Sequence, residues 1–144
     1  MFKYRFAIIF SAATFFGMIV SVHAGDLTVQ IRGVKEPTGV IGCALFNKEA
    51  GFTKRSSAIA LSGEKASVKG NTCIFKGLTE GNYAVAVLHD TNGNQKMDFS
   101  ALGFPTEDWG MSNNVRPALR APTFKESAFN VGTSPVTISV NLAQ

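Results

Sequence analysis

Histidine, tryptophan and cysteine are scarce in this chain of 144 residues, which contains two His, one Trp and two Cys. One histidine, His23, lies in an apolar N-terminal segment, so His89 is the remaining imidazole for general-base catalysis or metal binding. The chain also lacks a Gly-x-Ser-x-Gly motif, the turn that presents the nucleophile in many hydrolases. The composition therefore gives little support to an enzyme.

Blocks of like charge are also missing. The chain has 14 Lys and Arg against 10 Asp and Glu, a formal net charge of +4. Two of the basic residues, Lys3 and Arg5, precede the N-terminal apolar run, and the net charge without them is +2. The other Lys and Arg are scattered, so the sequence gives no basic patch that would bind nucleic acid.

The one long apolar run covers residues 6–20 and is followed by Val22-His23-Ala24. A positive start, an apolar run and small residues at the positions read by signal peptidase predict an export signal over residues 1–24. An uncleaved membrane anchor is the alternative, but a spanning helix needs about 20 apolar residues. We expect a periplasmic or secreted protein, residues 25–144, that is not embedded in a membrane.

An exported chain with two cysteines predicts a disulfide between Cys43 and Cys73. The bond would close a loop of about 30 residues. Both cysteines lie in apolar runs, so two buried free thiols are the alternative. Residues 25–144 are enough for one domain with its own core.

The periodicity is that of short strands, and helix is scarce. Six segments alternate between apolar and polar residues or are apolar throughout, as strands are: 27–31, 40–46, a weaker one at 66–68, 72–78, 83–89 and 136–142. Gly70-Asn71 predicts a hairpin between the third and fourth of these. Short helical turns are expected at 49–55 and from the capping-box sequence at Thr123 through Phe129. The pattern predicts an all-β sandwich with a long loop at 99–122.

Side-chain oxygens recur at every second position after the strand at 83–89. In the order of an EF-hand loop they would fill positions 1, 3, 5 and 9, with a backbone carbonyl at position 7. Glu107 is a nearby carboxylate that could complete the set. The resulting candidate metal ligands are Asp90, Asn92, Asn94, Lys96, Asp98 and Glu107.

Two departures from the EF-hand pattern are visible in this segment. Gln95 stands at the sixth position, which is normally Gly, and Ala101 at the twelfth, which is normally Glu. Asp, Asn and Gly also form tight turns without metal, because their side chains bind the local backbone. Calcium, a metal-free turn and a transition metal bound by His89 therefore remain as alternatives.

The predicted loop 99–122 contains three prolines and the large apolar residues Phe104, Trp109 and Met111. These could pack as a lid on the sandwich or line a ligand groove. The candidate ligand-binding residues are His89, Trp109, Ser112, Asn113, Asn114 and Arg116. Alternatively, the polar residues among them satisfy backbone groups of an irregular loop.

Two local sequences resemble known β-sandwich proteins. Residues 90–98, DTNGNQKMD, resemble the calcium loop of the B repeats in serine-aspartate-rich staphylococcal adhesins, which have a transthyretin-like fold. Residues 78–83, LTEGNY, resemble the Leu-x-x-Gly-x-Tyr corner that is widespread in such sandwiches. These resemblances imply a calcium site and a transthyretin-like or immunoglobulin-like sandwich.

A further resemblance extends over nearly all of residues 25–144. Its carrying residues are 51–52 (GF), 81–85 (GNYAV), 89–98, 102–107 (LGFPTE), 110–114 (GMSNN), 122–124 (PTF) and 128–129 (AF). On these the chain is identified as a member of an exported bacterial family, domain-of-unknown-function family 2141. The activity of that family is not established, so the resemblance draws attention to the site without giving a reaction.

The sequence thus predicts an exported single-domain β-sandwich with one disulfide. The leading function is a non-enzymatic binding or structural module, with calcium as a candidate stabiliser and an unknown envelope or extracellular ligand. One alternative is a small hydrolase that uses His89 and nearby carboxylates as acid and base. Another is a purely structural envelope protein.

Overall fold

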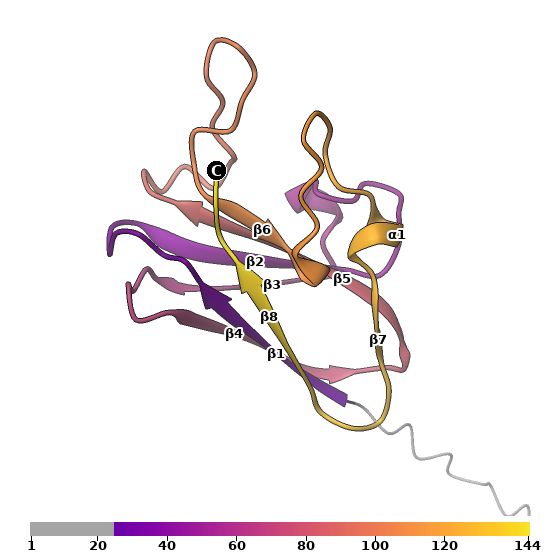
Figure 1. Ribbon diagram of the computed structural model, residues 1–144. Coiled ribbons are helices and arrows are strands. Elements are labelled where there is room, and N and C mark those ends of the chain that lie inside the picture. Colours follow the sequence, from indigo (N-terminus) through magenta and orange to yellow (C-terminus); the bar gives the residue numbers. More distant parts are fainter. Residues whose placement is uncertain (1–24) are drawn as a thin grey trace, which may run out of the picture.

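The computed structural model describes residues 25–144, so the predicted signal segment 1–24 lies outside the described residues. Two β-sheets pack face to face (Figure 1). The smaller sheet has the order β4-β1-β8 and contains β1 (Gly25–Arg32), β4 (Asn71–Leu78) and β8 (Val136–Asn141). The larger has the order β3-β2-β5-β6 and contains β2 (Val40–Phe46), β3 (Ala60–Lys65), β5 (Gly81–Asp90) and β6 (Trp109–Met111). The predicted all-β sandwich is confirmed.

The core lies between the two sheets and follows from the alternation of side chains along each strand. In β1 every second residue faces inward, and these side chains are fully buried. The central strands β2 and β5 contribute their own inward rows. The main inward residues of the three strands are Leu27, Val29, Ile31, Ile41, Cys43, Leu45, Tyr83, Val85 and Val87.

Helical structure is limited to single turns. Helix α1 (Phe124–Ser127) begins with the predicted capping box, in which the Thr123 hydroxyl and the Glu126 carboxylate each accept the other's backbone N–H. The 3-10 turn η1 (Arg55–Ser57) lies at the end of the turn expected at 49–55. Within residues 25–144, no helix is long and apolar enough to cross a membrane.

The weak strand predicted at 66–68 is wrong, and so is its hairpin with 72–78. The strand is β3, which lies earlier in the chain and pairs with β2. Residues after it form a turn that is held by Asn71, whose amide donates to Glu64 Oε1 and to the Lys65 carbonyl, each at 2.9 Å. β3 is an edge strand with mostly exposed side chains, so its hydrophobic alternation is weak.

The predicted loop 99–122 is shorter than expected because it contains β6 and the 3-10 turn η2 (Ser112–Asn114). A further short strand, β7 (Phe129–Val131), pairs with the start of β5. Strands of three residues are too short to show a period. β6 also pairs with the segment that follows β8, because Trp109 and Ala143 exchange backbone hydrogen bonds of 3.0 and 3.1 Å.

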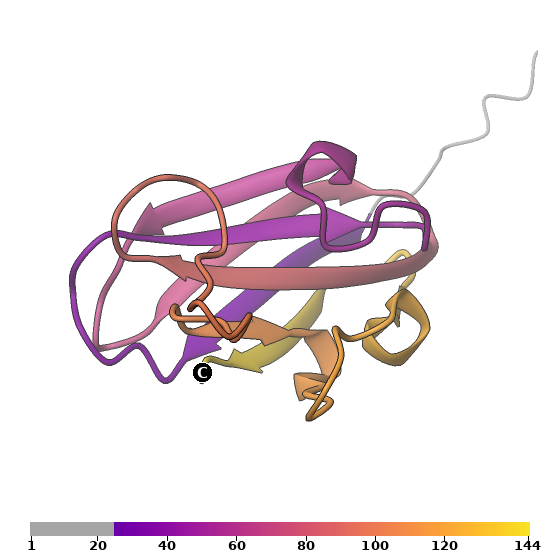
Figure 2. The same ribbon diagram turned by 90° about the horizontal axis from the view of Figure 1, so that it is seen from above.

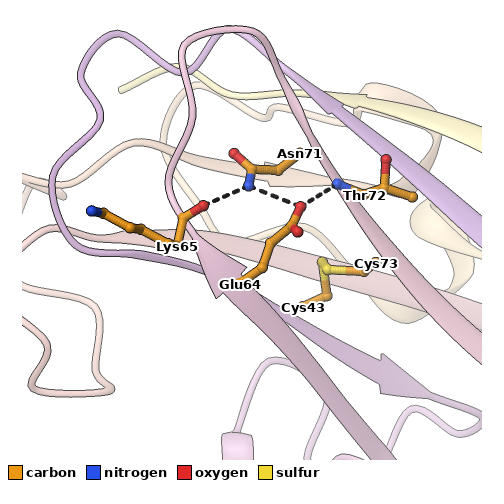
Figure 3. Close-up of a disulfide and its surroundings, with 6 residues drawn as sticks. All are labelled: Cys43, Glu64, Lys65, Asn71, Thr72 and Cys73. Carbon is orange, nitrogen blue, oxygen red and sulfur yellow. Dashed lines mark hydrogen bonds between the residues drawn. A yellow bond between two sulfur atoms is a disulfide. The ribbon is translucent and has the colours of Figure 1, made fainter.

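The predicted disulfide is confirmed. Cys43 of β2 and Cys73 of β4 are bonded at 2.07 Å, so the bond links the larger sheet to the smaller one (Figure 3). Beside it, Glu64 of β3 accepts a 2.6 Å hydrogen bond from the backbone of Thr72 in β4. The bond and the carboxylate together tie β2 and β3 to β4.

Replacing both cysteines, Cys43→Ala with Cys73→Ala, is expected to lower the free energy of unfolding by about 3–4 kcal/mol, because the bond closes a loop of 30 residues in the unfolded chain. Urea denaturation with and without reductant measures this. Reductant should weaken the native protein and leave the double variant unchanged. Equal stability of the oxidised and reduced native protein would contradict the expectation.

Candidate functional site

Strand β5 ends at Asp90, whose buried carboxylate binds the backbone of the turn that follows. Oδ1 accepts the N–H groups of Gly93 at 2.7 Å and Asn94 at 3.1 Å, and Oδ2 accepts that of Gln95 at 2.7 Å. A carboxylate offers about four lone-pair positions. Three are used here, so Asp90 shapes this turn through backbone hydrogen bonds.

Asn92 and Asn94 direct their amide nitrogens at Asp98. The donor distances to the Asp98 oxygens are 2.6 Å from Asn92 and 3.0 Å from Asn94. The two amide oxygens instead accept the backbone N–H groups of Asn94 and Lys96. N–H donors therefore surround the Asp98 carboxylate where calcium would need oxygens.

The donor set has the chemistry that calcium prefers, since all its candidate atoms are oxygens. Bringing the amide oxygens of Asn92 and Asn94 toward Asp98 requires both amides to rotate. Within residues 25–144, no three His, Cys, Asp or Glu side chains come together as a group that could hold a metal ion. The hydrogen bonds just described account for the shape of this turn.

Glu107 joins the two ends of the same turn. Its Oε1 accepts the Thr91 N–H at 2.9 Å and the Thr91 hydroxyl at 3.2 Å, and its Oε2 accepts the Asp98 N–H at 3.3 Å. The segment after Asp98 therefore folds back against the turn, and the Glu107 carboxylate is buried between them. The role of Glu107 in this structure is to bind backbone N–H groups.

His89 is 2% exposed and lies on the inner face of β5. Its Nε2 is 2.8 Å from the Thr38 carbonyl oxygen, and the described residues give its ring no hydrogen bond to a carboxylate. Glu107 and Asp108 border the same small hollow, of about 310 Å³. Asp108, however, pairs with Lys35 at 2.9 Å. The pairing of His89 with a carboxylate that a hydrolase would need is therefore not formed.

A large groove lies on the outer face of the larger sheet. Side chains that alternate with the core residues of β2 and β5 point outward, and pairing aligns them in rows across the strands. Two adjacent rows form the floor. One contains Gly63, Gly42, Leu88 and Trp109, and the other contains Leu61, Ala44, Ala86 and Met111. The floor of the groove is therefore apolar, and the residues at its centre have small side chains or none.

Loops enclose this floor on three sides (Figure 2). The loop after β5 rises at one end, the segment containing η1 at the other, and residues 115–122 beside β6. Large apolar side chains on these walls are exposed, including Phe104 at 59% and Leu119 at 93%. The volume of the groove is about 1430 Å³.

Gly42 lies in the middle of this floor, in a central strand. A Cβ built at this position would meet no atom within 4 Å. Gly in a strand interior is unfavourable, and it often marks a place where a ligand or another backbone approaches closely. Neither packing nor a left-handed backbone conformation requires Gly at this position.

Trp109 and Arg116 form a fixed pair at the β6 side of the groove. The Arg116 guanidinium lies 4.0 Å from the centroid of the Trp109 ring, within range of a cation–π interaction. It also donates a hydrogen bond to the Trp109 carbonyl. Both residues line the groove, so these two of the predicted ligand-binding residues reach it.

The other polar candidates of this segment bind the backbone. The buried Ser112 hydroxyl donates to the Ser127 carbonyl at 2.5 Å and accepts the Val85 N–H at 3.0 Å. Asn113 donates to two carbonyls near α1, and Asn114 pairs with the backbone of β8. None of the three lines the groove. These contacts match the alternative in which they satisfy backbone groups.

A protein-family model, described as "Uncharacterized protein conserved in bacteria (DUF2141)", matches residues 29–139. The chain belongs to this family. DUF2141 membership confirms the resemblance identified from the sequence, and the matched segment includes β2, β5, the turn after β5 and nearly all of the residues that line the groove. No curated protein and no solved structure matches the chain. The description assigns DUF2141 no activity, so the function has to be argued from the site.

Sequence reasoning missed the groove floor, although a signal for it was present. In VIGCALF the inward residues are Ile41, Cys43 and Leu45, and the outward ones between them are only Gly42 and Ala44. The run is apolar on both faces, but the side chains on its outer face are much smaller than those on its inner face. A buried central strand would place larger side chains on both of its faces.

Gln95 has φ of 63°, in the left-handed region that Gly adopts with least strain. Gln95→Gly is therefore expected to raise the free energy of unfolding, by about 0.5–1 kcal/mol. Thermal and urea denaturation measure it. Gln95→Ala, which keeps a Cβ, should give no comparable gain. A Gly variant less stable than the native protein would show that the Gln95 side chain itself stabilises the turn.

Proposed function

We propose that the protein is an exported, non-enzymatic binding module that holds an elongated apolar ligand in the groove above β2 and β5. The observation that carries the proposal is Gly42, a central-strand glycine with open space above it. A side chain there would stabilise the strand and fill the floor. Its absence leaves the groove deep enough for a ligand.

The chemistry of the groove supports an apolar ligand. Its floor is built from glycines and apolar side chains that include Trp109 and Met111, and its walls carry exposed Phe99, Phe104 and Leu119. A contiguous exposed apolar patch with polar residues at its rim commonly marks an interaction site. Transfer of apolar surface from water gives about 25 cal/mol per Å², which supplies the driving force for binding.

The two alternative functions draw less support from the site. The hydrolase alternative needs His89 to act with a carboxylate, but His89 faces away from the groove and binds a backbone carbonyl. The Asp90 carboxylate, which does line the groove, accepts three backbone N–H groups. A purely structural protein would have no use for an open floor at Gly42. We therefore place the function in ligand binding.

Calcium enters this proposal as a stabiliser of the turn that walls one end of the groove. The Asp98 carboxylate is contacted by the side-chain amides of Asn92 and Asn94. If both amides rotate so that their oxygens face Asp98, these three side chains would hold the ion. Asp90 is already bound by three backbone N–H groups. The ion would add a charge interaction at the rim and no chemistry in the groove.

Filling the floor should block the ligand without harming the fold. Gly42→Val is expected to weaken binding of the uncharged fluorophore N-phenyl-1-naphthylamine by about tenfold, because its side chain occupies the open space. The same change should raise stability by up to about 1 kcal/mol. Fluorescence titration and urea denaturation measure the two effects.

Thr28→Val is the matched control, because Thr28 points outward from β1 on the opposite sheet. It should leave the affinity for the fluorophore unchanged. Gly42→Ala should fall between the native protein and Gly42→Val. Equal affinities in the native protein and Gly42→Val would remove the groove as the binding site.

Calcium is expected to bind weakly, with Kd about 10⁻⁴–10⁻³ M, and to raise the melting temperature at millimolar concentration. Calorimetric titration and thermal melts in calcium and in chelator measure this. Asp98→Asn should abolish the response, whereas Lys96→Gln should retain it because only the Lys96 backbone is a candidate ligand. Identical melts in calcium and chelator would exclude the ion and leave the groove proposal intact.

A further inference from the structure

The charged residues that line the groove are mainly basic. Among residues 25–144 four basic side chains and one acidic side chain line it: Arg55, Lys96, Arg116, Arg120 and Asp90. The Asp90 carboxylate is turned to three backbone N–H groups of its own turn. A ligand in the groove therefore meets an apolar floor and a positively charged rim.

The basic residues differ in how they are held. Arg120 forms two hydrogen bonds with Glu126, at 2.9 and 2.6 Å. These bonds and those from Thr123 hold the pKa of Glu126 at about 2, so the pair stays ionised and mutually neutralised at neutral pH. Arg55 and Lys96 are exposed side chains near opposite ends of the groove.

Arg116 is the basic residue that is pre-positioned to bind an anion. Stacking on Trp109 and the hydrogen bond to the Trp109 carbonyl fix the guanidinium at the edge of the floor. A guanidinium has five N–H donors, and within the described residues Arg116 has this single hydrogen-bond acceptor. The remaining donors suit a carboxylate or phosphate, which Arg can bind through two parallel hydrogen bonds.

We propose that the ligand is an anionic amphiphile, and this inference rests on the proposed function. Its long acyl chain lies over Gly42, Ala44 and Ala86, and its head group binds Arg116. The floor spans four strands, about 14 Å at the usual strand spacing. An extended acyl chain can lie along such a floor. The apolar surface supplies affinity, and the guanidinium selects the charge and orients the chain.

Calorimetric titration of the purified protein with chain-matched probes tests this inference, at neutral pH and below the concentrations at which the probes form micelles. The probes are dodecanoate, dodecanol and dodecyltrimethylammonium. Dodecanoate should bind about tenfold more tightly than dodecanol, and the cation more weakly than either. In Arg116→Gln the preference for dodecanoate should disappear while the affinity for dodecanol stays unchanged.

Arg120→Gln is the matched control, because Arg120 is already paired with Glu126, and it should keep the preference for dodecanoate. Equal binding of dodecanoate and dodecanol, or a preference retained in Arg116→Gln, would overturn the head-group assignment and leave the apolar groove intact. Loss of the preference in Arg55→Gln instead would overturn the assignment to Arg116. Failure of every probe to bind would overturn the proposed function itself.

Lysophosphatidylglycerol and dodecanoate, compared in the same titration, distinguish two sources of the anionic head group. Tighter binding of the lysolipid indicates a membrane phospholipid, and tighter binding of dodecanoate indicates a free fatty acid. Either order supports an anionic amphiphile, provided that Arg116→Gln weakens both probes and leaves dodecanol unaffected.

Discussion

Two buried carboxylates, Asp90 and Glu107, determine the path of the chain between β5 and β6. Between them they accept five backbone N–H groups from the turn after β5. Buried backbone groups must find partners, and an irregular segment on a sheet lacks ladder bonds to supply them. Because this segment is held, β6 returns beside β5 and places Trp109 at the groove. The end wall and one edge of the floor both depend on these two side chains.

The sheet itself supplies the rest of the groove. The middle of β2 presents Ile41, Cys43 and Leu45 to the core and only Gly42 and Ala44 to the outside, and Ala86 of β5 extends this open floor. The disulfide at Cys43 ties β2 to the smaller sheet from the inner side. Gly42 is next to Cys43 in sequence and lies on the outer face of β2. The inner face of β2 therefore stabilises the fold, and its outer face is left open to a ligand.

The strands with a clear period, such as 27–31 and 136–142, could be predicted from the sequence, and so could the capping box at Thr123 and the disulfide. β3 and β6 could not, because an exposed edge strand and a three-residue strand carry no period. At the candidate site, the segment 90–98 was found from its oxygen spacing. The same side chains bind backbone N–H groups here, and spacing does not distinguish that role from metal ligation. The groove requires the pairing register of four strands, which the sequence does not contain.

The proposed ligand site is the outer face of β2 and β5. Amide chemical-shift mapping by ¹H–¹⁵N NMR during titration with dodecanol, whose head group is uncharged, tests it most directly. If the ligand binds there, the largest chemical-shift changes fall on Gly42, Gly63 and Ala86, while the Thr28 amide on the opposite sheet stays unchanged. Largest shifts on the smaller sheet, or shifts spread evenly over exposed apolar residues, would contradict it.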